Sequence, residues 1–427
     1  MRPQLAALCL FLPMVAAGQA FTPDKKLLLS EGVLRGSPRL MGIAGAFVGV
    51  AEGAEGITRN PAAAVSKDAH FENDFNVDFG AALHFLPPWA VQDQDWDLDG
   101  RPDQVEAQGG PVFNFLGTQV LYLAASLQYK NVALGLGVDF QNFLAKTTRE
   151  GDPFESYFNL NLAHAFGALA FSLWEDQILL GIGAESTHAF FIYSEQPPTQ
   201  SLPSPKDSLG YNGWGIQFGG LWRPKNEDYR VGFSFRPAAV GLPTSQRTDI
   251  AGYVPFSAIV APARVSLGAS WALGSSGRHY NIIGPEGWAE LEEKTPEGAP
   301  TYSAAMTRWL LTTQLDVYFP VKNATYAGAF LEQARGAPAL AAGEVVSFVP
   351  RAAVEKEAVE DRLRLRLGGY IEPRQVDTPH ANWVRPHVTF GFELYLFKLG
   401  PQRISFGLSF DLARQYQNLS VAFLVWK

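Results

Sequence analysis

A strict alternation of apolar and polar residues is the feature that most constrains the fold of this chain. From Arg385 to Tyr395 every second residue is apolar, and the residues between them are mostly polar. The segment from Arg403 to Leu412 repeats the pattern. Successive side chains of a strand point to opposite sides, so a period of two indicates strands with two unlike faces. The pattern predicts an all-β chain, which could be a soluble sandwich or a membrane barrel.

Strand length, aromatic placement and charge placement favour the barrel. The alternation recurs in further segments of up to about ten residues, the length that a tilted strand needs to cross a bilayer. These segments are Leu121–Tyr129, Val132–Phe140, Phe158–Leu169, Leu179–Phe191, Trp214–Trp222, Val231–Phe235, Arg264–Trp271, Trp309–Phe319, Tyr326–Glu332 and Leu363–Tyr370. Aromatic residues gather at the strand ends, as in an interfacial girdle: Trp174, Tyr193, Trp222, Trp271, Trp309, Phe319, Tyr395 and Phe397. Charges lie deep on the polar faces, where a lumen accepts them: Asp139, Glu185, Arg236, Asp316, Glu393 and Asp411.

Connections of unequal length complete the barrel pattern. The links at Lys130-Asn131 and Lys225–Asp228 are tight, whereas others are long and polar. Short turns at one end and long loops at the other are typical of transmembrane barrels. The last strand runs to Trp426, an aromatic terminus of the kind found in outer-membrane barrels, although Lys427 follows it. The sequence therefore predicts a transmembrane antiparallel β-barrel of about 14 strands, with the count least certain over 278–302 and 338–360.

The first 20 residues have the features of a signal peptide. One Arg precedes an apolar run from Leu5 to Ala17, and a small-residue exit follows, so we expect cleavage after Ala20. The single cysteine, Cys9, lies within this run, which excludes disulfides and thiolate sites from the mature chain. The net charge of −8 and the lack of a basic cluster argue against nucleic-acid binding. These features predict export to the outer membrane of a Gram-negative bacterium.

The stretch from Gly36 to Asp68 fits neither a helix nor a strand. Small residues, among them Gly45 and Gly49, recur every few positions, and the stretch closes on Asn60-Pro61-Ala62. Glycine weakens both helix and strand interiors. Such a segment can fold compactly in a confined space, where backbone approaches backbone closely.

Residues 42–62 resemble the N-terminal hatch of FadL-type outer-membrane transporters of long-chain fatty acids and hydrocarbons. The resemblance rests on the small-residue run and on the Asn60-Pro61-Ala62 end; the strands Tyr229–Pro237 and Arg362–Pro373 are also similar to strands of that family. It implies a 14-stranded barrel over 70–427 with a hatch over 21–69 in its lumen, and sideways release of an apolar ligand into the bilayer. Candidate gating residues are Asn60, Pro61, Ala62, Gly45 and Gly49. The acidic patch at Glu52–Glu55 departs from the family pattern and puts the hydrogen bonding of the hatch in doubt.

The long loop 88–117 carries carboxylates at the spacing of a calcium loop. They occupy positions 1, 3, 5, 9 and 12 of a twelve-residue segment with Gly100 at position 6: Asp95, Asp97, Asp99, Asp103 and Glu106. Ca²⁺ takes six to eight oxygen ligands, and a tight turn at glycine brings alternate side chains inward. A solvated acidic loop is the alternative. We expect Ca²⁺ here and no organic cofactor.

Arg362, Arg364 and Arg366 alternate with leucines, which predicts three guanidinium groups on one face of a strand. They are candidates for binding a fatty-acid carboxylate through paired hydrogen bonds. The alternative, which we favour, is a structural ladder that pairs with Glu393 and Asp411 on neighbouring strands.

Neither the histidines nor the serines show a spacing that predicts metal binding or nucleophilic catalysis, so we expect no enzyme. The leading hypothesis is passive uptake of hydrophobic small molecules by a monomer in contact with outer-membrane lipids. The alternative is a partner-binding or secretion-associated barrel.

Overall fold

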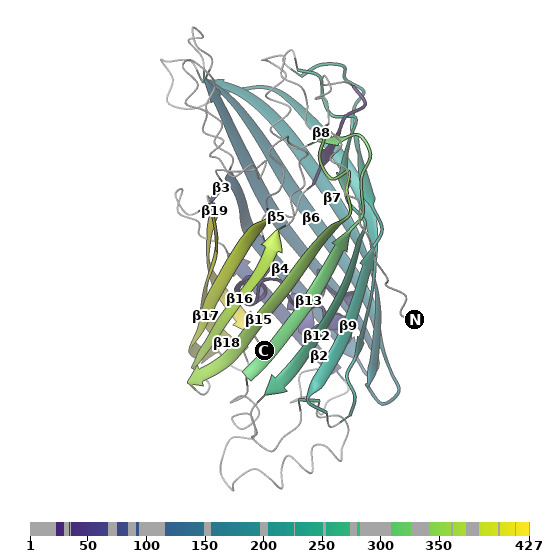
Figure 1. Cartoon of the computed structure of the whole chain (residues 1–427), viewed down its shortest axis with the longest axis vertical. Coiled ribbons are helices and arrows are strands. Elements are labelled where there is room, and N and C mark those ends of the chain that lie inside the picture. Colours follow the sequence, from purple (N-terminus) through teal and green to yellow (C-terminus); the bar gives the residue numbers. More distant parts are fainter. Residues whose placement is uncertain are drawn as a thin grey trace, which may run out of the picture.

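The computed structural model describes residues 23–29, 34, 36–66, 75–83, 91–93, 116–148, 155–196, 204–225, 227–250, 253–273, 280–281, 309–325, 341–359, 362–372, 384–399, 402–414 and 416–426. These residues form a tilted antiparallel barrel with the N-terminal segment inside it (Figure 1). Within the described part of the chain, no helix is long and apolar enough to cross a membrane.

Fourteen described strands make up the wall, as the alternation predicted. They are β2 (Phe75–Leu83), β4 (Leu116–Tyr129), β5 (Val132–Thr148), β6 (Glu155–Leu173), β7 (Ile178–Gln196), β8 (Ser204–Trp222), β9 (Tyr229–Arg236), β12 (Arg264–Leu273), β13 (Trp309–Tyr318), β15 (Ser347–Val359), β16 (Leu363–Glu372), β17 (Arg385–Leu399), β18 (Gln402–Ala413) and β19 (Tyr416–Trp426). The short strand β3 (Val91–Asp93) pairs with β19 near the point where the ring closes. Apolar side chains such as Phe233, Leu267 and Leu315 are exposed on the outer face.

Several strands are longer than the sequence pattern predicted. The strands β6, β7 and β8 each have 19 residues, against about ten needed to cross a bilayer. The strand β15 was not predicted, because its outward positions include Lys356 and its inward positions carry charge. The predicted strand Tyr326–Glu332 lies outside the described residues.

Prolines interrupt three neighbouring wall strands at one level. Arg236, Arg264 and Tyr318 lie opposite one another in the ladder, and Pro237, Pro262 and Pro320 lie close to them in the chain. Proline donates no backbone hydrogen bond and cannot continue a central strand. The regular ladder is therefore interrupted here.

A smaller ladder occupies the level above the break. The strand β10 (Ala239–Pro243) pairs with β8 and with β11 (Ala258–Ala261). Strand β1 (Lys26–Leu28), from the start of the described chain, pairs in parallel with β11 and with β14 (Ala324–Thr325). The N-terminal segment is thereby fixed to the interrupted part of the wall.

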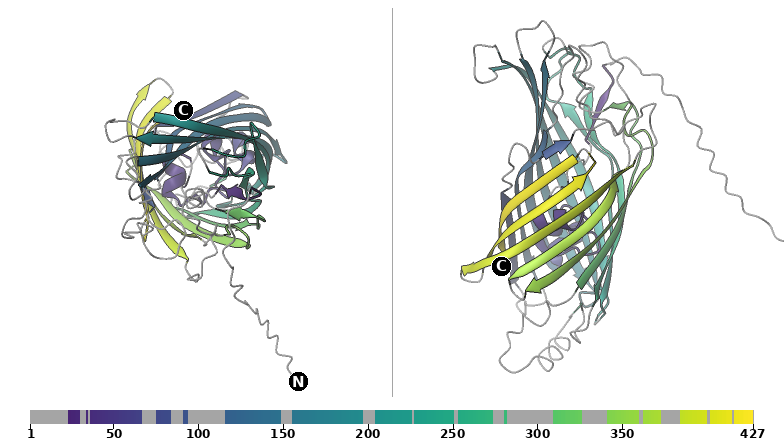
Figure 2. Two further views of the ribbon diagram at one scale, coloured as in Figure 1. Left: turned by 90° about the horizontal axis from the view of Figure 1, so that it is seen from above. Right: turned by 60° about the vertical axis from the view of Figure 1, so that its left-hand side comes forward.

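Below β1 the chain makes three single turns inside the ring: α1 (Pro38–Gly42), α2 (Gly53–Gly56) and the 3₁₀ helix η1 (Pro61–Val65) (Figure 2). The small side chains of this segment are completely buried, including Ala44, Ala46, Ala54 and Ala63. We call residues 36–66 the plug. Its short helices were not predicted, since glycine recurs too often for a helix longer than one turn.

Candidate functional site

The Asn60-Pro61-Ala62 turn attaches the plug to the wall. The Asn60 side-chain oxygen accepts a hydrogen bond from the Ala62 N–H at 3.1 Å and so caps η1, with Pro61 at its first position. The side-chain amide of Asn60 also donates to the carbonyls of Val48 at 3.1 Å and Gly220 at 3.0 Å. One buried side chain thus joins two parts of the plug to β8.

Glycines of the wall leave room for this turn. A Cβ atom at Gly181 of β7 would overlap the backbone of Ala62, and one at Gly219 of β8 would overlap the Asn60 side chain. In the plug, Gly49 lies against β12, where an added Cβ would come within 2.6 Å of the Ala269 nitrogen. Gly45 has a φ of +71°, a conformation that favours glycine. Of the two glycines predicted to matter in the hatch, Gly49 therefore allows close approach to the wall, and Gly45 allows the backbone conformation.

Polar side chains of the wall bind the irregular backbone of the plug. Thr312, Ser270 and Thr389 donate to the carbonyls of Ala46 (2.7 Å), Gly49 (2.8 Å) and Gly42 (3.1 Å), and Gln314 accepts from the Val48 N–H at 3.0 Å. A buried backbone group without a partner costs free energy. These bonds replace the ladder that the glycine-rich segment cannot form for itself.

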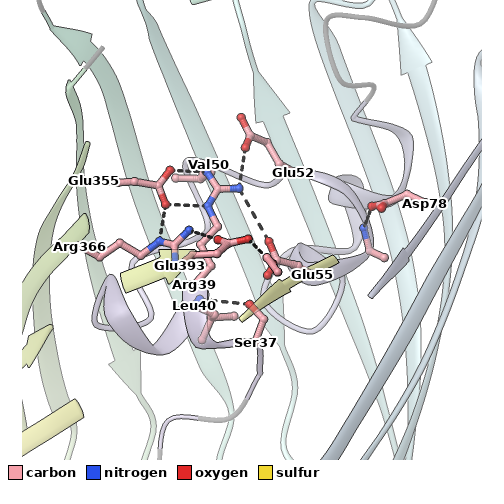
Figure 3. Close-up of polar contacts among 12 residues, drawn as sticks. Ser37, Arg39, Leu40, Val50, Glu52, Glu55, Asp78, Glu355, Arg366 and Glu393 are labelled. Carbon is pink, nitrogen blue, oxygen red and sulfur yellow. Dashed lines mark hydrogen bonds and ion pairs between the residues drawn. The ribbon is translucent and has the colours of Figure 1, made fainter. Parts of the chain in front are cut away.

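A buried ionic network joins the plug to β15, β16 and β17 (Figure 3). Arg39 donates two hydrogen bonds of 3.0 Å to Glu355 and one of 2.9 Å to Glu52. Arg366 bridges Glu355 at 2.6 Å and Glu393 at 2.5 Å. Removing one partner from such a network leaves a buried charge uncompensated, so the network stabilises one position of the plug.

The acidic patch of the plug belongs to this network. Burial disfavours ionised Glu52, but Arg39 and Arg230 outweigh that effect and hold its pKa below the ordinary value. Burial raises the pKa of Glu55 to about 8, and Arg39 offsets this only in part, with its guanidinium 3.8 Å away. At neutral pH, Glu55 is therefore mostly protonated. The patch that departs from the family pattern is paired with arginine here.

Above the plug, the inner face of the barrel becomes apolar and aromatic. The buried cluster comes from β1, β6, β7, β8, β11 and two residues between β10 and β11. We call it the upper apolar cluster: Leu27, Leu160, Leu162, Ala189, Phe191, Tyr193, Leu209, Tyr211, Ile250, Phe256 and Ile259. Phe191 packs against Tyr211 and Phe256 at ring distances of 5.3 and 5.8 Å. Tyr211 donates its hydroxyl to the Phe256 carbonyl at 2.8 Å, so this polar atom is satisfied. The inner face at this level is therefore lined by apolar and aromatic side chains.

The three candidate arginines do not form one stripe. Arg362 lies in the turn before β16, Arg364 stacks over Tyr395 at 5.4 Å, and Arg366 is buried in the ionic network. The expectation of three guanidinium groups on one strand face is therefore wrong for Arg362, because β16 begins at Leu363. The pairing of Arg366 with Glu393 is as expected, whereas Asp411 binds His387 at 2.8 Å and Tyr370 at 2.7 Å. Head-group binding by these arginines stays a prediction.

The proposed calcium ligands Asp95, Asp97, Asp99, Asp103 and Glu106 lie outside the described residues, as does the signal segment 1–20. Among the residues that the structure does describe, no group of three His, Asp or Glu side chains is placed to hold a metal ion.

Sequence reasoning missed Arg39 and Glu355. Nothing local distinguishes them, and they are 316 positions apart in the chain. An Arg beside a glycine-rich segment and a Glu at an inward strand position are the only signals available.

The fold is shared with one known channel among the structures compared. CymD, a monoaromatic hydrocarbon channel, aligns with 12% identity and a TM-score of 0.50 over 93% of this chain and 98% of its own. A Pseudomonas aeruginosa FadL homologue aligns with 11% identity and a TM-score of 0.49 over 96% and 98%. The Pseudomonas putida toluene transporter TodX aligns with 12% identity and a TM-score of 0.46 over 87% and 91%. No protein-family model and no curated sequence matches the chain. The likeness to CymD shows a common fold, in agreement with the expected plugged barrel.

Proposed function

We propose that the protein is an outer-membrane channel of the FadL type, which takes up hydrophobic small molecules such as long-chain fatty acids or hydrocarbons. The observation that carries the proposal is the upper apolar cluster inside a barrel whose lumen also holds the plug. Burial contributes about 0.8 kcal/mol per CH₂ group, so an acyl chain needs no covalent chemistry to be held there. The ligand enters from the end of the barrel that carries the long loops.

The proposed exit is sideways, at the proline-interrupted level of the wall. Leu27 of β1 and Ile259 of β11 belong both to the upper apolar cluster and to the ladder above the break. On the outer side at this level, Val240 and Leu242 of β10 are exposed. A ligand leaving the cluster past β11 would therefore meet apolar surface along its route to the bilayer.

Binding of a fluorescent fatty acid to the purified protein in detergent tests the proposal. Phe191→Ala removes an aromatic ring from the cluster and should weaken binding by at least about tenfold, since a buried Phe contributes about 1.5–3 kcal/mol. Phe190→Ala is the matched control, because Phe190 is the adjacent residue and is 50% exposed on the opposite face. Equal affinity in the two variants would refute binding in the upper apolar cluster.

Lipid extraction with mass spectrometry identifies the substrate class. Wild-type protein should retain fatty acids or hydrocarbons, and Phe191→Ala should retain less. If neither protein carries apolar compounds and neither binds the probe, the barrel is not a channel for them.

A further inference from the structure

Three polar side chains form a hydrogen-bonded chain on the outside of the barrel. Ser186 and His188 lie on β7, and Asn212 lies opposite His188 on β8. The Ser186 hydroxyl is 2.8 Å from His188 Nε2, and His188 Nδ1 is 2.8 Å from the Asn212 side-chain oxygen. These three hydrogen-bonded residues belong neither to the plug nor to the upper apolar cluster.

The outward direction follows from the alternation along β7 and β8. On β7, odd positions face the lumen: Gly181 lies against the plug, and Phe191 belongs to the upper apolar cluster. Even positions face outward, as exposed Ile182 and Phe190 show. On β8, Gln217 binds the plug carbonyl of Arg59, whereas Trp214 and Ile216 are exposed. Ser186, His188 and Asn212 share the even, outward face.

The direct cross-strand neighbours of these three residues are apolar or small, whereas Asn161 of β6, opposite Phe190, is polar. Trp214 is 71% exposed and lies opposite Ser186, and Leu242 is 63% exposed and lies opposite Asn212. Polar groups on a lipid-facing surface cost free energy, and in a membrane protein they are a functional hypothesis by default. Apolar residues would serve equally well at these positions if the wall had only to face lipid.

The geometry fixes the role of each nitrogen of His188. The Asn212 oxygen can only accept a hydrogen bond, so His188 Nδ1 carries the proton. In the neutral imidazole, Nε2 then accepts the hydrogen bond of the Ser186 hydroxyl. A nucleophile held by a base, with the base oriented by a third group, is the arrangement used for nucleophilic acyl transfer.

We propose that Ser186 and His188 are catalytic residues of an acyl-ester hydrolase on the lipid-facing wall, with Asn212 as the positioning residue and a membrane glycerophospholipid as the substrate. The substrate class follows from the placement, because exposed apolar side chains beside the three residues give a membrane lipid a surface to contact. Exposed Phe190 and Leu242 flank the chain and offer contact to acyl groups.

The reaction balances with water as the only co-reactant. Ser186 Oγ attacks the carbonyl carbon of the ester while its proton passes to His188 Nε2. The bond to the glycerol oxygen breaks, and His188 returns the proton to that oxygen. Water then attacks the acyl-serine and gives a proton to His188. The bond from the acyl carbon to Ser186 Oγ breaks, a fatty acid leaves, and the proton returns to Ser186.

An ester substrate can approach Ser186 from the side of β6. Ala165 lies opposite Ser186 and Ala163 opposite His188, so short side chains border the chain on that side. Ser186 itself is 6% exposed, and the indole of Trp214 lies on its other side. An ester therefore reaches Ser186 from the bilayer over the two alanines.

The test uses the full-length protein in mixed micelles of detergent and phosphatidylcholine. A fluorophosphonate probe labels activated serines, mass spectrometry locates the adduct, and released fatty acid is measured in parallel. We expect the adduct on Ser186 and none in Ser186→Ala. His188→Ala should lower labelling and fatty-acid release by at least about 100-fold, the smallest contribution usual for a general base. His188→Gln, which keeps a polar side chain but no base, should do the same.

Two further variants separate catalysis from a structural role. Asn212→Asp keeps an acceptor for His188 Nδ1 and should retain activity, whereas Asn212→Leu should lose it while the melting temperature of the barrel is kept. Ser208→Ala changes another exposed serine of β8 and should label as wild type does. Failure of the probe to label Ser186, or equal labelling in His188→Gln, would overturn the proposal; neither outcome bears on fatty-acid binding in the lumen.

Discussion

The close approach of the plug to β9 allows a sharp test of plug docking. Gly232 of β9 faces the lumen, and a Cβ atom added there would overlap the carbonyl oxygen of Val48. Backbone cannot yield as a flexible side chain does, so the Gly232→Ala variant must move Val48 away from the wall. Gly80 of β2 offers a matched control, because a Cβ atom there meets nothing within 4 Å.

The cost follows from the hydrogen bonds that Val48 makes. Its carbonyl accepts from Asn60 at 3.1 Å, and its N–H donates to Gln314 at 3.0 Å. Each bond contributes about 0.5–1.5 kcal/mol net, so the loss of both weakens docking by about 1–3 kcal/mol. That free energy raises the undocked fraction by about 5–150-fold. Gly80→Ala should instead stabilise the strand by about 0.5–1 kcal/mol.

Single-channel conductance in planar bilayers measures how often the channel opens, which we expect to happen when the plug is undocked. Gly232→Ala should show frequent openings, while the melting temperature of the wall stays near that of the wild type because the backbone ladder of β9 remains intact. Gly80→Ala should stay closed. The reasoning is refuted if Gly232→Ala is as quiet as the wild type, or if Gly80→Ala opens equally often.

Two further predictions concern a proton and a metal ion. Burial raises the pKa of Glu55 to about 8, so Glu55 binds a proton more tightly in the docked plug than when exposed. Protonated Glu55 therefore favours docking near pH 4.5, and this contribution is lost as pH rises to about 8, so Glu55→Gln should remove the dependence of conductance on pH in this range. For the proposed calcium loop, titration calorimetry should detect Ca²⁺ binding to the wild type and none to Asp99→Ala. Identical traces for the two proteins would show that the segment is a solvated acidic loop instead.

Local sequence carried enough information to single out Asn60, Pro61 and Ala62 as the end of the small-residue stretch. It did not predict the short helix that follows, which Asn60 caps with Pro61 at its first position. The sequence did not show that the Asn60 amide reaches Gly220, since that contact depends on where β8 passes the plug.

The hydrogen-bonded residues on the outer face, Ser186, His188 and Asn212, also depend on strand register that the sequence does not show. Ser186 and His188 are two positions apart, so a strand places them on one face, but Asn212 comes from the next strand. Its pairing with His188 depends on the β7–β8 register and on the length of the connection between them. Sequence reasoning therefore found no partnered nucleophile.

The sequence by itself determined most of the wall strands, their two faces and the confined small-residue segment, because period and side-chain size are local properties of the chain. Tertiary structure decided which charges meet. Arg39 reaches Glu355 only because the plug lies inside the ring at the level of β15, and Arg366 joins them only through the β15–β16 register. Electrostatic partners are chosen by distance in space, and in a closed barrel that distance is set by register and by the depth of the plug.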